Sequence, residues 1–123
     1  MNYKAIKANI LKDLDLTEDS WRIQCWRVAS DHNELDGSRG YCHWQQKFPR
    51  HESKYTIYIR DDLGGADFVR TMAHELRHVW QWEHYKDSWS EWDHEYSDRR
   101  SERDANEYAA AFVAQRSKYV SHI

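Results

Sequence analysis

The sequence has little of what would place it in a membrane or on a nucleic acid. No apolar run reaches the length of a signal-peptide core or of a membrane span. Lys and Arg number 18 against 21 for Asp and Glu, and the resulting net charge of −3 argues against binding to nucleic acid or to a membrane surface. We therefore expect a cytoplasmic protein with neither kind of partner.

Cysteine and aliphatic side chains are also scarce. The two cysteines, Cys25 and Cys42, form no C-x-x-C pair, which disfavours a zinc site built on them. We expect reduced, mostly buried thiols, although neighbouring strands could bring the two together. Seven Trp and eight Tyr compensate for the thin aliphatic supply, so much of the core is expected to be aromatic. A chain of 123 residues fits a single compact domain, residues 1–123.

Hydrophobic periodicity predicts both helices and strands. Apolar residues recur at helical spacing over residues 3–14, about 67–82 and 101–113. Alternating, β-branched or aromatic residues predict strands over residues 21–28, 41–48 and 55–59. The first two strands could form a hairpin across the loop between them. This order predicts an α+β fold, in which a small, mostly antiparallel sheet of about three strands packs against an N-terminal, a central and a C-terminal helix.

The central helix contains the motif His74-Glu75-Leu76-Arg77-His78, which reads H-E-x-x-H. One helical turn separates the two histidines, so both imidazoles can reach one metal ion at about 2.0–2.1 Å. Glu75 points in a neighbouring direction, where it can act on a water as general base rather than bind the metal. The apolar stripe of this helix lies on another side, so the motif is expected to face a cleft.

A catalytic zinc needs a third protein ligand and one open position. Glu102, in the C-terminal helix, borders a narrow alanine-rich stripe that would let this helix approach another closely. Packing of that stripe against the central helix would deliver Glu102 to the metal. Asn106, one turn later, would then be close enough to hydrogen-bond a ligand.

Two further sources of the third ligand stay open. His84 matches the last histidine of the longer pattern H-E-x-x-H-x-x-G-x-x-H, but Gln81 stands where that pattern needs a glycine to turn the chain back. Residues of the segment between the two helices could also bind, with less precise placement because they lie in a loop: Asp93, His94 and Glu95.

A family resemblance is carried by two segments, T-M-A-H-E-L-R-H-V-W-Q and S-E-R-D-A-N-E-Y-A-A. Together they resemble the gluzincin metallopeptidases, and most of all the small ImmA/IrrE-like and minimal-gluzincin proteins. The resemblance implies that His74 and His78 are zinc ligands, that Glu75 is the general base and that Glu102 is the third ligand. Asn106 stands where many gluzincins carry an Asp that orients a ligand histidine.

The resemblance covers roughly residues 55–113 and implies zinc-dependent hydrolysis of peptide bonds, with one catalytic Zn²⁺ and a protein or peptide substrate. In folds of that family, the strand near residues 55–59 helps form the rim of the cleft, where an extended substrate could pair with a free edge. Candidates to stabilise the oxyanion are Tyr96, Arg99 and Arg100. The alternative function is a non-catalytic, zinc-stabilised interaction module. The ImmA-like resemblance also suggests a regulatory protease that acts on a transcriptional repressor.

Overall fold

The computed structural model describes residues 2–16, 23–47, 52–85 and 100–116. Within these ranges, the helices are α1 (Tyr3–Asp13), the short 3-10 helix η1 (Asn33–Leu35), α2 (Gly65–Tyr85) and α4 (Arg100–Gln115). The strands are β1 (Ile23–Val28), β2 (Gly40–Lys47) and β3 (Glu52–Arg60). This arrangement confirms the predicted α+β class. None of the described helices is both long enough and apolar enough to cross a membrane.

The three strands form one mixed sheet in the order β1-β3-β2. β3 pairs in parallel with β1 and antiparallel with β2, so the first two strands do not form the hairpin that the sequence suggested. The central strand is the one with the strongest β-forming sequence, and its residues Tyr55, Ile57 and Ile59 are fully buried. A central position gives these side chains neighbours on both adjoining strands, which explains why β3 lies between the other two.

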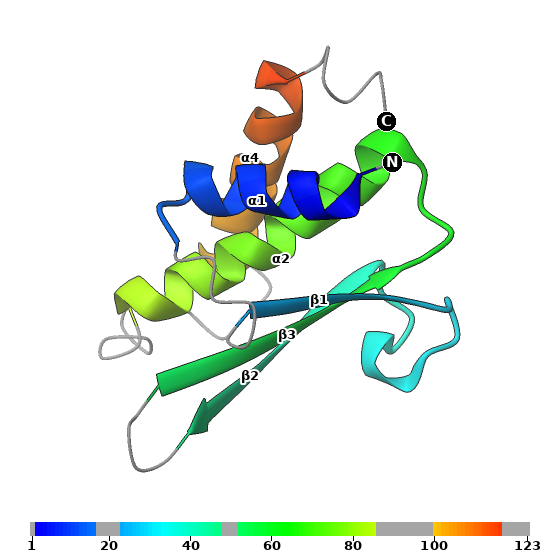
Figure 1. Ribbon diagram of the computed structural model, residues 1–123, viewed down its shortest axis with the longest axis horizontal. Helices are drawn as coiled ribbons and strands as arrows, with labels where there is room; N and C mark the ends of the chain where they lie inside the picture. The colour runs from blue at the N-terminus through cyan, green and yellow to red at the C-terminus, as the bar shows by residue number, and fades with distance from the viewer. Residues whose placement is uncertain (1, 17–22, 48–51, 86–99, 117–123) are drawn as a thin grey trace.

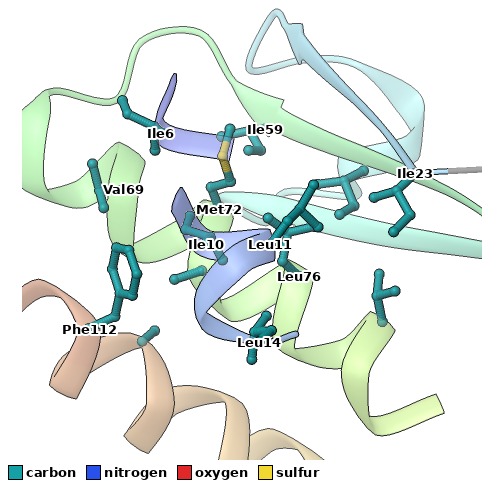
Figure 2. Close-up of a cluster of buried hydrophobic side chains, with 14 of the residues drawn as sticks. Ile6, Ile10, Leu11, Leu14, Ile23, Ile59, Val69, Met72, Leu76 and Phe112 are labelled. Atoms are coloured by element: carbon teal, nitrogen blue, oxygen red, sulfur yellow. The ribbon is translucent and has the colours of Figure 1, made fainter. Parts of the chain in front are cut away.

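The α-helices α1, α2 and α4 lie on one face of the sheet (Figure 1). Figure 2 shows side chains of α1, α2, α4 and the sheet converging between these layers, where burial of each large apolar side chain contributes about 1.5–3 kcal/mol. The expectation that much of the core is aromatic holds only in small part for the described residues. Most buried members of the cluster are aliphatic, and its buried aromatic rings are Tyr55, Phe68 and Phe112.

The C-terminal helix packs against α2 through small side chains. Ala105 and Ala109 are fully buried on the inner face of α4, and the two helices make extensive contact. Small residues let helix axes approach closely, as the alanine-rich stripe predicted. On the flank of this contact, the hydroxyl of Tyr108 donates a hydrogen bond of 2.7 Å to the carboxylate of Asp13 at the end of α1. α4 is therefore fixed against both other helices.

The cysteines are free and partly buried. Cys25 and Cys42 lie on opposite sides of Ile57 in the sheet register, so two strand spacings of about 4.8 Å separate them, which is too far for a disulfide. Burial raises the pKa of the Cys25 thiol to about 11 and also raises the pKa of Cys42. Both are therefore protonated, unreactive thiols at neutral pH.

Candidate metal centre

The side chains of His74, His78 and Glu102 converge between α2 and α4. The Nε2 atoms of the two histidines are 3.1 Å apart. The Glu102 carboxylate spans them, with Oε2 at 3.2 Å from His74 Nε2 and Oε1 at 3.1 Å from His78 Nε2. Tetrahedral ligands at about 2.0–2.1 Å from a zinc ion are about 3.3 Å from one another. These three residues, which the sequence proposed as ligands, are thus grouped so that they could hold one metal ion.

Helix geometry accounts for this convergence. His74 and His78 are one turn apart on α2, and Glu102 lies in the first turn of α4, where a carboxylate is favoured by the helix dipole. Hydrogen bonds with His74 and His78 lower the pKa of Glu102. Burial lowers the pKa of His78, but its hydrogen bond with Glu102 and the charge of Glu75 outweigh that effect, so the net pKa is raised. Glu102 is therefore a charged oxygen donor, the form that binds a cation.

Glu75 lies beside the three convergent side chains without joining them. It is only 7% exposed, and its Oε1 is 3.9 Å from His74 Nε2. Burial raises the pKa of Glu75, although the charges of His78 and His74 oppose this rise. A carboxyl group held in this way, next to side chains that could hold a metal ion, is suited to accept a proton and to return it.

A cavity of about 730 Å³ opens over the cluster. It is lined by the three convergent side chains and Glu75, and also by residues 40–42 at the start of β2. The strand expected at this rim, residues 55–59, belongs instead to the central strand β3, which is paired on both sides. The edge strand beside the cavity is β2.

Gly40 allows α2 to lie close to this edge strand. A Cβ atom at residue 40 would be 2.7 Å from Thr71 Cγ2, 3.2 Å from the carbonyl oxygen of Tyr58 and 3.3 Å from Glu75 Cγ. Any side chain there would push α2 away from β2. The absence of a side chain at Gly40 thus lets Glu75 lie close to β2, which also lines the cavity.

We expect Gly40→Ala to destabilise the protein by about 1–3 kcal/mol, because overpacking forces the neighbouring backbone to shift. Urea unfolding measures this change. Gly64→Ala is the control, since a Cβ there would meet nothing within 4 Å. Adding Thr71→Ser to Gly40→Ala removes the methyl group in closest contact and should recover part of the loss. A Gly40→Ala protein as stable as wild type would show that the close approach is not required.

Of the remaining predicted site residues, the structure describes Asn106 and Arg100. Asn106 lines the cavity, but among the described residues its side chain makes no hydrogen bond to His74 or His78. Arg100 is exposed at the start of α4 and does not line the cavity within the part of the chain that the structure describes. Tyr96 and Arg99 lie outside the described residues.

His84, the histidine considered as a third ligand, is likewise separate from the cluster. It is exposed, stacks on Trp80 with ring centroids 4.2 Å apart, and bonds through Nδ1 to the Trp80 carbonyl oxygen at 2.8 Å. This position confirms that α2 continues past His78 without the turn that a third histidine would need. The loop residues considered for the same role lie outside the described residues: Asp93, His94 and Glu95.

Sequence reasoning missed the role of Gln81, which is completely buried. Its Oε1 lies 2.8 Å from His78 Nδ1, and its Nε2 lies 2.8 Å from both the Ser101 carbonyl oxygen and Asp104 Oδ2. Asp104 is also held by Arg77, with Nε to Oδ2 at 2.7 Å. The sequence did carry one signal of this role. Gln81 is a polar residue three positions after His78, and side chains at that spacing on a helix lie next to each other.

Comparisons with protein-family models, with curated proteins and with solved structures find no match to this chain. The assignment of a function therefore depends on the chemistry of the site alone.

Proposed function

We propose that this protein is a zinc-dependent peptidase in which His74, His78 and Glu102 bind the metal and Glu75 is the general base. The observation that carries this proposal is the position of Glu75. It is a buried carboxyl group that borders both the cavity and the three convergent donors, yet stands apart from the donors themselves. A site that only stabilised the fold would not require a further carboxyl group facing a cavity.

Two nitrogen donors and one carboxylate oxygen suit zinc, and three protein ligands leave a coordination position open. Zinc bound there would polarise a carbonyl group and lower the pKa of a water molecule toward about 7. Glu75 would accept a proton from the attacking water at its carboxylate and donate it to the leaving amine nitrogen. The balance is that of hydrolysis: the peptide C–N bond breaks, a C–O bond forms, and the proton moves to nitrogen.

A protein or peptide is the substrate that the cavity favours. Residues 40–42 belong to an edge strand of the sheet and line the same cavity as Glu75. An extended peptide can pair with the free edge of such a strand through main-chain hydrogen bonds, with the scissile bond directed toward the metal centre. This contact would recognise the backbone, which suits peptide-bond cleavage.

We expect the purified protein to contain about one zinc ion per chain and to cleave members of a diverse peptide library. Removal of the metal with a chelator should abolish cleavage, and zinc should restore it, because the site then regains its metal. Mass spectrometry of the digests measures both the cleavage and its sequence preference. Zinc-loaded protein that cleaves no member of the library would contradict the peptidase proposal.

That last outcome would favour the second candidate, a non-catalytic module stabilised by zinc. The specific observation in its favour is that the ligands come from two helices, so a metal ion would cross-link α2 and α4. In that case, zinc should raise the melting temperature while substitution of Glu75 has no functional consequence.

A further inference from the structure

The side-chain amide of Gln81 has only one orientation compatible with its neighbours. One end of the amide contacts the Ser101 carbonyl oxygen and Asp104 Oδ2, both at 2.8 Å. A carbonyl oxygen only accepts hydrogen bonds. Both carboxylate oxygens of Asp104 accept hydrogen bonds from Arg77, at 2.7 and 3.2 Å, so this group is also an acceptor. The end that faces two acceptors must therefore be the NH₂ group, Nε2.

The other end of the amide is then the oxygen, Oε1, which lies 2.8 Å from His78 Nδ1. An amide oxygen cannot donate, so the hydrogen in this bond belongs to His78 Nδ1. A neutral ring with its hydrogen on Nδ1 has a lone pair on Nε2, which a metal ion can take in place of the hydrogen bond to Glu102. That atom is the one that faces His74 and Glu102, at 3.1 Å from each.

We infer that Gln81 is a positioning residue that holds His78 in the tautomer able to bind metal and, through the same amide, fixes α4 relative to α2. Its partner Ser101 directly precedes Glu102, and its partner Asp104 lies two residues after Glu102. The buried Gln81 side chain thus determines which ring nitrogen of His78 has the lone pair, and it also fixes the position of α4, the helix that carries Glu102. Substitution of a group that hydrogen-bonds a metal ligand commonly lowers metal affinity by about 10- to 100-fold.

Asp104 and Arg77 complete this arrangement. Arg77 donates to both carboxylate oxygens of Asp104, at 2.7 and 3.2 Å, and its guanidinium lies 3.6 Å from the centre of the Trp80 ring. The bidentate geometry fixes the plane of the carboxylate, and the stacked ring restricts the arginine. Asp104 is consequently an acceptor of fixed orientation. It disfavours a rotation of the Gln81 amide that would swap the positions of Oε1 and Nε2.

This inference rests on the metal site of the proposed function but does not require catalysis. The first test uses the metal-free Glu102→Ala protein at a pH where His78 is neutral, because in the wild type the Glu102 carboxylate, 3.1 Å from Nε2, would also accept the ring hydrogen. Long-range ¹H–¹⁵N NMR distinguishes the two ring nitrogens by whether each carries a hydrogen. We expect Nδ1 of His78 to be protonated and Nε2 to be unprotonated. Protonation of Nε2 instead would overturn the inference, whatever the protein does to peptides.

The second test compares Gln81→Leu with Gln81→Glu. Gln81→Leu removes the acceptor, so the Nδ1–H tautomer should lose its dominance and zinc affinity, measured by competition with a chelator, should fall about 10- to 100-fold. Gln81→Glu keeps an oxygen facing Nδ1 and should keep the tautomer. Because Gln81→Glu also places two carboxylates together, the double variant Q81E/D104N supplies an amide donor at residue 104. It should recover only part of the folding stability, since the side chain at residue 104 then no longer offers two charged oxygens to Arg77.

These readouts separate positioning from simple packing. A packing role would make all three variants lose stability without a selective change in the tautomer. Gln81→Leu protein that folds, keeps the Nδ1–H tautomer and binds zinc as tightly as wild type would overturn the inference. If the tautomer follows the expected pattern but no peptide is cleaved, the positioning role stands and the peptidase proposal fails.

Discussion

The Glu75→Gln protein is expected to bind zinc normally and to lose peptide hydrolysis by about 100- to 10,000-fold, the usual contribution of general acid–base catalysis. The amide keeps the shape of the carboxyl group but cannot accept the proton of the attacking water. Zinc binding should persist because the three convergent donors are untouched. Zinc content measured by elemental analysis, together with the rate of peptide cleavage, checks both parts of this expectation.

The matched control is Glu107→Gln, since Glu107 is an exposed acid on α4. It removes the same charge and should leave both zinc content and cleavage unchanged. The two variants differ in burial. Glu75→Gln replaces a buried charge, which is costly to desolvate, by a neutral amide. We therefore expect Glu75→Gln to be at least as stable as wild type. Cleavage at the wild-type rate by Glu75→Gln would refute the assignment of the general base.

The second large effect is expected for Glu102→Ala, which should reduce zinc affinity by more than about 100-fold. Loss of a residue that only hydrogen-bonds a metal ligand commonly lowers metal affinity by about 10- to 100-fold. Glu102 is proposed to bind the metal directly, so its loss should have a larger effect. Its side chain is 47% exposed, so its removal leaves no buried cavity, and the metal-free fold should persist. Isothermal titration with zinc measures the affinity, and circular dichroism of the metal-free protein measures the fold.

Glu107→Ala is the control for this second experiment, because it shortens an exposed acid on the same helix. It should bind zinc as wild type does. Unchanged zinc affinity in Glu102→Ala would move the third ligand to another residue and remove the basis of the proposed site. The expected result, loss of zinc binding without unfolding, would show that α4 packs against α2 without the metal.

The part of the site that sequence could predict is the part fixed by a single helix. The spacing of His74 and His78 determines their direction as soon as the helix forms, whatever surrounds it. Glu102 was predictable for a different reason: the alanine stripe of Ala105 and Ala109 shows which face of α4 packs closely, and Glu102 borders that face. Both inferences use local periodicity, which a sequence displays directly.

The features that sequence did not reveal depend on contacts between distant segments. Strand propensity identifies β3 but not its neighbours, so the parallel pairing with β1 was not foreseen. The orientation of Gln81 depends on Ser101 and Asp104, which become its neighbours only after α4 has packed. The excess of Trp and Tyr likewise suggested an aromatic core, whereas Trp26 is 53% exposed and Tyr41 is 42% exposed. Composition alone does not say which rings are buried.

Because His78 and Glu102 are far apart along the chain and belong to separate helices, an unfolded molecule offers zinc no assembled site. By mass action, free zinc at 100 times its dissociation constant would then favour the folded state by about 2.7 kcal/mol. For a protein that binds zinc as proposed, the fraction of folded molecules would vary with the zinc supply of the surroundings, and scarcity of the ion would lower the amount of folded protein.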